Sequence, residues 1–313
     1  MKENKDKKKV GVLRGGVGGD YTSSLERGAD LISHIVEYLA DKYKIVDILV
    51  DRDGVWHING IQAKPADLMY RVDVVWNTAH SSLCSILERL SIPVIGVDSF
   101  VHGIGNNRTL LLQHIKELDI KMPQHIILPF YQADFDGPKN ARLDSHQARQ
   151  EYAEKKAQEV FKKFAGPWIV RSLTHDSGSA VHVAKTLPEL ANAIEDILVH
   201  KTSILVEELI AGQIVPVHSL RDFRGEEIYT LPLGNLPASP KEEITSLTKK
   251  LHQHLGQHTY MKSNFLLTPK GRVYLTGLFF HPNLKKASHL SQSLESVGAK
   301  VHHFIEHMIE KAR

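Results

Sequence analysis

Short apolar runs alternate with amphipathic stretches along the first third of the chain. Residues 10–13 form an apolar run that ends before Gly15, which is typical of a buried strand followed by a tight turn. The next stretch has apolar residues at helical spacing and begins near Thr22 or Ser23, either of which can cap a helix. Further runs predict strands at 44–50, 56–58, 72–76 and 93–97, and a short helix at 82–90. Strands and helices in this order predict a parallel, three-layer α/β domain over residues 1–105.

The rest of the chain divides into two further predicted domains, at residues 106–202 and 203–313. The first contains predicted helices at 107–118, 147–164 and 187–199, with Asn107 as the cap of the first, and extended segments at 121–128, 168–171 and 180–184. The second contains predicted strands at 203–207, 214–220 and 227–231, a helix at 241–255, a hairpin at 261–267 and 272–278, and a closing helix at 288–311.

Composition narrows the class of protein. Hydrophobic residues make up 42% of the chain and charged residues 24%, as in globular proteins. The 39 Lys and Arg nearly balance the 36 Asp and Glu, so no nucleic-acid partner is indicated. The basic first residues precede no apolar segment, and no run is long enough to span a bilayer, so we expect a cytoplasmic protein with no membrane partner. The single cysteine, Cys84, cannot form an internal disulfide, and we expect it in the core.

Three segments of the chain, taken in order, carry a resemblance to a known family. The first is VGVLRGGVGGDYTSSLERG at residues 10–28, where a strand ends in glycines and an acidic residue precedes a helix. The second is IPVIGVDSFVHGIGNNRTLLLQHI at 92–115, and the third is ILVEELIAG at 204–212. Together they resemble the D-alanine–D-alanine ligases of the ATP-grasp superfamily, in which the second segment joins the first and central domains and the third is the hinge that contacts adenine. The resemblance covers nearly the whole chain and implies a three-domain ATP-grasp architecture with an N-terminal Rossmann-like domain.

The resemblance also implies a nucleotide site. In the family, ATP converts a carboxylate into an acyl phosphate, which an amine then attacks. Arg108 and Arg171 stand where the family has lysines that contact the phosphates, and both keep a positive charge. Glu207, Glu208 and Leu209 match the hinge, where a carboxylate and the backbone meet the adenine. ATP is therefore the expected nucleotide.

The amino-acid site is retained in part. By resemblance, Asp20 lies near the ammonium of the first substrate, and Ser288 near the carboxylate of the second. His80 matches a histidine on the substrate side, and Lys262 replaces an arginine that stabilises the oxyanion. Ser177 lies in the segment that matches the loop closing over the phosphates. We take His80, Ser177 and Lys262 as vestigial catalytic candidates.

The metal site is where the sequence departs from the family. Magnesium requires hard oxygen ligands, commonly carboxylates together with substrate phosphates. The family supplies an aspartate on one strand and a glutamate and an asparagine on the next. Here these positions are Asn264, Gly277 and Phe279, so we expect no metal ligands and no bound magnesium. The lid of the family is also shortened, to residues 231–239.

The 19 histidines raise a separate metal hypothesis. Two groups have close spacing, namely His252, His254 and His258, and His303 with His307. Neither group has the acidic HExxH pattern, so a metal site is the weaker interpretation.

Three functions remain open. The first is a catalytically degenerate ATP-grasp protein that still binds a nucleotide or an amino acid. The second is an active ATP-dependent carboxylate–amine ligase of the D-alanine–D-alanine type. The third is a binding module without nucleotide. By analogy with the family, we also expect a homodimer.

Overall fold

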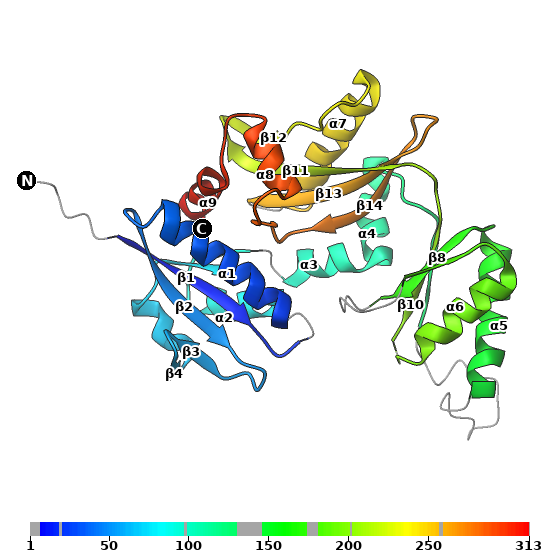
Figure 1. Ribbon diagram of the computed structural model, residues 1–313, viewed down its shortest axis with the longest axis horizontal. Helices are drawn as coiled ribbons and strands as arrows, with labels where there is room; N and C mark the ends of the chain where they lie inside the picture. The colour runs from blue at the N-terminus through cyan, green and yellow to red at the C-terminus, as the bar shows by residue number, and fades with distance from the viewer. Residues whose placement is uncertain are drawn as a thin grey trace, which may run out of the picture. The chain divides into compact units, whose positions relative to one another are not determined.

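The computed structural model describes residues 7–18, 21–96, 99–129, 146–173, 181–200, 202–256 and 259–312, and only the backbone of residues 99, 106 and 108. The chain forms two compact units, one built from residues 1–121 and 213–313 and the other from residues 122–212. Each unit has its own sheets and helices (Figure 1). The boundaries of the three expected domains stay a prediction.

The larger unit begins with a six-stranded sheet in the order β4-β3-β2-β1-β5-β6. Its strands are β1 (Lys8–Gly15), β2 (Tyr43–Val50), β3 (Trp56–Ile58), β4 (Ile61–Ala63), β5 (Val74–Asn77) and β6 (Val94–Ile95). Strands β2, β1, β5 and β6 are parallel, as predicted. Strands β3 and β4 form an antiparallel hairpin at one edge, so the sheet is mixed.

Helices cover both faces of this sheet, because alternate residues of its strands point to opposite sides. On one side Val10 packs with Leu31 and Phe304, and on the other side Leu13 packs with Leu87. The covering helices are α1 (Tyr21–Tyr38), η1 (Pro65–Tyr70), η2 (Ser81–Leu83), α2 (Cys84–Arg89) and α9 (Val301–Glu310). The predicted three-layer arrangement is therefore confirmed, and Cys84 is buried, as expected.

The larger unit also contains a four-stranded antiparallel sheet in the order β12-β11-β13-β14. Its strands are β11 (Gln213–Phe223), β12 (Glu226–Thr230), β13 (Tyr260–Leu267) and β14 (Val273–Phe279). Helix α7 (Ala238–His254) packs against one face, where His252 Nδ1 lies 2.8 Å from Ser219 Oγ. On the opposite face, Leu220 and Tyr260 join the core beneath α9. The predicted hairpin of β13 and β14 is confirmed.

One expectation for helices was wrong, and one helix was not predicted. The closing segment is not one helix but two, α8 (His289–Glu295) and α9, which are separated around Gly298 at a φ of +70°. Helix α3 (Ser99–Asn106) was not predicted, because its two glycines lower helix propensity. Gly105 is required there, since an added Cβ would lie 2.6 Å from the Phe280 ring.

Helix α4 (Arg108–Ile115) follows α3 directly, and η3 (Lys116–Leu118) extends it. The predicted cap is confirmed, because Asn107 Oδ1 accepts hydrogen bonds from the backbone N–H groups of Thr109 and Leu110, at 3.0 and 3.1 Å.

The smaller unit contains a four-stranded antiparallel sheet in the order β7-β10-β8-β9. Its elements are β7 (His125–Leu128), α5 (His146–Lys163), β8 (Trp168–Ser172), β9 (Val181–Ala184), α6 (Leu187–Leu198) and β10 (Ile204–Glu208). Trp168 of β8 and Val206 of β10 pack with Ala157 of α5 and Ile194 of α6. Strand β10, which the sequence placed at the start of the last domain, therefore lies between β7 and β8.

The end of β1 generates a stability prediction. Gly15 has a φ of +87°, and an added Cβ would lie 2.1 Å from the carbonyl oxygen of Val50. We expect Gly15→Ala to lower the free energy of unfolding by roughly 3 kcal/mol or more, because backbone strain and a clash with fixed backbone combine. Urea denaturation measures this change.

Gly16→Ala is the matched control. Gly16 also has a positive φ, +111°, but no atom lies within 4 Å of its added Cβ. The control is expected to lose only about 1–2 kcal/mol from backbone strain. Equal losses in the two variants would contradict the proposed clash.

Candidate functional site

Two rows of paired residues cross strands β11, β13 and β14 next to each other. The rows are His218–Lys262–Phe279 and Pro216–Asn264–Gly277. Because alternate residues of a strand share a face, both rows lie on the face opposite α7. The structure thus brings together four residues that the sequence singled out, which are Lys262, Asn264, Gly277 and Phe279.

A positive charge occupies this face. The Lys262 ammonium lies over the ring of Phe279, 5.2 Å from its centroid, which is a cation–π contact. Burial lowers the pKa of Lys262, and no acidic group opposes that shift. Within the described part of the chain, Lys262 forms no ion pair. The charge on this face is therefore the reverse of what a magnesium site requires.

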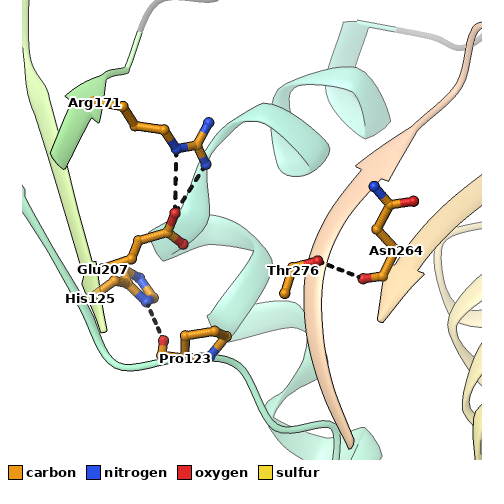
Figure 2. A network of polar contacts seen from close by, with 6 residues as sticks. All are labelled: Pro123, His125, Arg171, Glu207, Asn264 and Thr276. Atoms are coloured by element: carbon orange, nitrogen blue, oxygen red, sulfur yellow. Dashed lines mark hydrogen bonds and ion pairs between the residues drawn. The ribbon is translucent and has the colours of Figure 1, made fainter. Parts of the chain in front are cut away.

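The residues at the family's metal positions do not fit a divalent cation. Asn264 Oδ1 is a hard oxygen that is buried and has no hydrogen-bond partner among the described atoms, but it is a single neutral ligand. Gly277 offers no side chain, and the ring of Phe279 already faces the Lys262 ammonium. That ammonium would also repel an incoming cation. Thr276 lies beside this site and donates its hydroxyl hydrogen bond to the Asn264 carbonyl at 3.0 Å (Figure 2).

A chain of hydrogen bonds, buried at its Tyr260 end, includes His218, the residue paired with Lys262 on β11. His218 Nδ1 lies 2.8 Å from the hydroxyl of Tyr260, and His218 Nε2 lies 2.9 Å from His289 Nδ1. Desolvation, with smaller contributions from His289 and Lys262, lowers the pKa of His218 to about 3. His218 is therefore neutral at pH 7. Sequence reasoning missed this chain, because its members come from three separate elements, β11, β13 and α8, which only the folded structure brings together.

Two predicted substrate residues have local structural contacts. His80 caps η2, where its Nδ1 accepts from the backbone N–H of Ser82 at 3.2 Å. Ser288 caps α8, where its Oγ accepts from Ser291 N and donates to Asn283 O. These contacts explain the residues as helix caps. A substrate contact for either residue stays a prediction.

The predicted phosphate cation and the predicted adenine acceptor contact each other in the smaller unit. Arg171 Nε and Nη2 lie 3.3 and 3.1 Å from Glu207 Oε2, as Figure 2 shows. The Glu207 side chain is 8% exposed and that of Arg171 27%, so the pair is largely shielded from water. A nucleotide that used both residues would have to open or share this ion pair.

The hinge backbone is already hydrogen-bonded. The N–H of Glu208 donates to Gln124 O, and the N–H of Leu209 donates to Pro167 O, both at 2.8 Å. The Leu209 N–H is therefore engaged, and a contact of the Leu209 backbone with an adenine stays a prediction. Next to the hinge, His125 Nδ1 lies 3.2 Å from Pro123 O (Figure 2).

Three predicted site residues cannot be placed. Asp20 and Ser177 lie outside the described residues, and only the backbone of Arg108 is described. Helix α4 begins at Arg108. The roles assigned to these residues stay predictions.

A second group of histidines lies in the larger unit. The ring centroid of His102 is 5.5 Å from that of His80 and 6.3 Å from that of His281. Burial, then the charge of Arg27, then His102 and His80, lower the pKa of His281 to about 3. Within the described residues, no group of three or more His, Cys, Asp or Glu side chains could hold a metal ion. His252, His254, His303 and His307 are among the described residues and belong to no such group. His258 lies outside the described residues.

Comparison with known proteins shows what the chain is similar to. No protein-family model matches the chain. The D-alanine–D-alanine ligase of Geotalea uraniireducens is 23% identical over 334 aligned residues, which cover 97% of the chain and 96% of that ligase. The structure of D-alanyl-alanine synthetase A from Vibrio cholerae superposes with a TM-score of 0.75 at 17% identity, over 98% of both chains. Over nearly its whole length, the chain is similar to D-alanine–D-alanine ligases in sequence, at low identity, and in fold.

The α/β fold of this ligase-like protein is that of the ATP-grasp ligases, as the sequence predicted. A D-alanine–D-alanine ligase from Bacillus anthracis, solved in complex with ATP, superposes with a TM-score of 0.70 at 19% identity, over 97% of the chain and 96% of that ligase. In the described part of the chain, no helix has the length and apolar character needed to cross a membrane.

The buried His218 generates a prediction of pH dependence. The folded protein keeps His218 neutral down to about pH 3, whereas the unfolded chain protonates it near its ordinary pKa of 6.5. Between these values the unfolded state binds more protons, so stability falls as the pH is lowered. His218 alone should lower the free energy of unfolding by roughly 1.4 kcal/mol per pH unit below 6.5.

Urea denaturation between pH 7 and pH 4.5 measures this slope. In His218→Gln, the amide oxygen can still accept from Tyr260. We expect the slope of unfolding free energy against pH to decrease by roughly 1.4 kcal/mol per pH unit, the contribution of one proton. An unchanged slope would show that His218 is protonated in the folded protein over this range.

Proposed function

We propose that this D-alanine–D-alanine ligase-like protein is catalytically degenerate and still binds a nucleotide or an amino acid. One observation carries the proposal. On the face where the family holds magnesium, the chain has an amide, a glycine and an aromatic ring that contacts a lysine ammonium. Without a metal, the triphosphate charge is not neutralised for phosphoryl transfer.

The nucleotide of this proposal is ATP. The adenine would meet Glu207, Glu208 and the backbone at Leu209, and the phosphates would meet Arg108 and Arg171. The contact of Arg171 with Glu207 supports this assignment, because one nucleotide that shared their ion pair could reach both residues. We also propose that the protein is cytoplasmic and forms a homodimer, by analogy with its family.

The second candidate is an active ATP-dependent carboxylate–amine ligase. It is favoured by Lys262, which keeps a cation at the family's oxyanion position, and by the substrate-side residues Asp20, His80 and Ser288. In this alternative, Lys262, His80 and Ser177 would be catalytic residues. An additional carboxylate would then have to complete the metal site.

A ligase assay separates the two candidates. We expect the protein, supplied with ATP, D-alanine and Mg²⁺, to release no ADP or phosphate above the rate without protein, because no ligand set holds the metal. Coupled detection of ADP measures this rate. The active ligase would be established instead if ADP were released only with D-alanine present and no longer released by Arg171→Ala.

Rebuilding the metal ligands tests the proposal from the other direction. In the triple variant Asn264→Asp, Gly277→Glu and Phe279→Asn, we expect ATP to raise Tm more with Mg²⁺ than with EDTA, because a carboxylate pair can bind the metal. In the natural protein, Mg²⁺ should not increase the shift caused by ATP. Differential scanning fluorimetry measures both shifts.

Gly277→Glu alone is the control for this design. An added Cβ at Gly277 would lie 3.1 Å from Phe279 Cε2, so the single variant keeps a crowded site. We expect that Mg²⁺ does not increase the rise in Tm that ATP causes in this single variant. A Mg²⁺-dependent shift in the natural protein would contradict the loss of the metal site.

A further inference from the structure

Helix α9 connects the two sheets of the larger unit through one aromatic side chain. The ring centroid of its buried Phe304 lies 6.4 Å from that of Trp76 on β5 and 5.5 Å from that of Tyr260 on β13. All three rings belong to a single apolar cluster. Contacts at the two edges of α9 hold Phe304 in this place, so a change that weakened both edges would loosen α9 from the core.

Histidine rings gather at the edge where α9 meets α1. His302 of α9 stacks on Tyr38 of α1, with ring centroids 4.9 Å apart and an angle of 22° between the planes. The centroid of His303 lies 4.3 Å from that of His302, and the centroid of His34 lies 6.1 Å from that of Tyr38. Three imidazoles, two from α9 and one from α1, therefore belong to one row of ring contacts.

The charges around His302 favour its neutral form. The titratable groups that surround this row come from both helices and are His34, Glu37, Tyr38, Lys42, Lys300, His303 and Glu306. Burial lowers the pKa of His302, and the charges of His303 and Lys300 lower it further. Glu306 opposes this shift, but its carboxylate is shared with Lys42 in an ion pair. A proton on His302 would thus add a like charge beside Lys300.

A further histidine holds the opposite edge of α9. His307 Nε2 lies 2.8 Å from the carbonyl oxygen of Arg221 on β11, and a carbonyl only accepts, so His307 donates. Its ring also meets the ring of Phe223 edge-on, with centroids 5.0 Å apart. Burial lowers the pKa of His307. The charged groups around it are one base and two acids, Lys311, Glu310 and Asp222.

We propose that α9 is a pH-sensitive clasp, which joins the two sheets at neutral pH and detaches from α1 and β11 when its histidines take up protons. His302 senses pH on the α1 edge and His307 on the β11 edge. In the attached helix both rings favour the neutral form, whereas in a detached helix they bind protons near their ordinary pKa of 6.5. Detachment therefore becomes more favourable as the pH falls below 6.5. The clasp requires no nucleotide, metal or ligase activity.

Hydrogen–deuterium exchange of the full chain, followed by mass spectrometry between pH 7.5 and pH 5.0, measures this opening. The rates are corrected for the intrinsic exchange rate at each pH. We expect the protection of α9 to fall below pH 6.5, by at most about tenfold per pH unit for each of the two histidines. At pH 5.5, α9 should exchange faster than β13, whose central position requires the core to unfold.

Two substitutions remove the titrating groups and keep their contacts. His302→Phe retains a ring that can stack on Tyr38, and His307→Gln retains an N–H that can donate to the Arg221 carbonyl. We expect the double variant to keep most of its α9 protection down to pH 5.5, and each single variant to keep part of it. The single variants are measured separately, so the test remains available if the double variant does not fold.

His254→Gln is the matched control, because His254 is an exposed histidine of α7 in the same unit. Its α9 protection should depend on pH as in the natural protein. Equal protection of α9 and β13 at every pH would show that α9 opens only when the whole unit unfolds. That result, an unchanged pH dependence in the variants of His302 and His307, or the same reduction in His254→Gln would each overturn the proposal.

Discussion

The structure of this site depends on one electrostatic feature. It is the positive charge of Lys262, on the face of the β11–β13–β14 sheet opposite α7. A cation in a partly desolvated setting requires compensation from its surroundings. Here the compensation comes from the π face of Phe279, on the neighbouring strand. By the resemblance, the family has an arginine and an asparagine at these two positions. The chain therefore keeps a cation at the first position and exchanges the carboxamide at the second for an aromatic ring, which contacts that cation.

The surroundings of Lys262 are consistent with that change. His218, directly opposite on β11, is buried and neutral, so it adds no second positive charge at pH 7. Asn264, in the next row, offers a neutral oxygen. The face is thus suited to a single anionic group rather than to a cation held between several anions. All of these residues belong to the larger unit.

Much of the fold could be predicted from the sequence, because the spacing of apolar residues and the positions of glycine, proline and helix-capping residues determine local structure. The parallel strands, the cap at Asn107 and the hairpin around Gly271 all follow from patterns within a few residues. Helix α3 was missed because its packing against Phe280 requires a glycine, which lowers the helical signal. The metal positions could be located by resemblance, and the register confirms that they lie together. The contact of Arg171 with Glu207 and the Tyr260–His218–His289 chain could not be predicted, since each joins segments far apart in sequence.

The central claim is that no divalent metal binds beside Asn264. The most direct measurement is a crystal structure of the protein grown with Mn²⁺ and a non-hydrolysable ATP analogue, with anomalous scattering used to locate manganese. We expect no anomalous peak within coordination distance, about 2–2.5 Å, of Asn264 Oδ1. A manganese ion bound there, with carboxylates from elsewhere in the chain completing its shell, would contradict it.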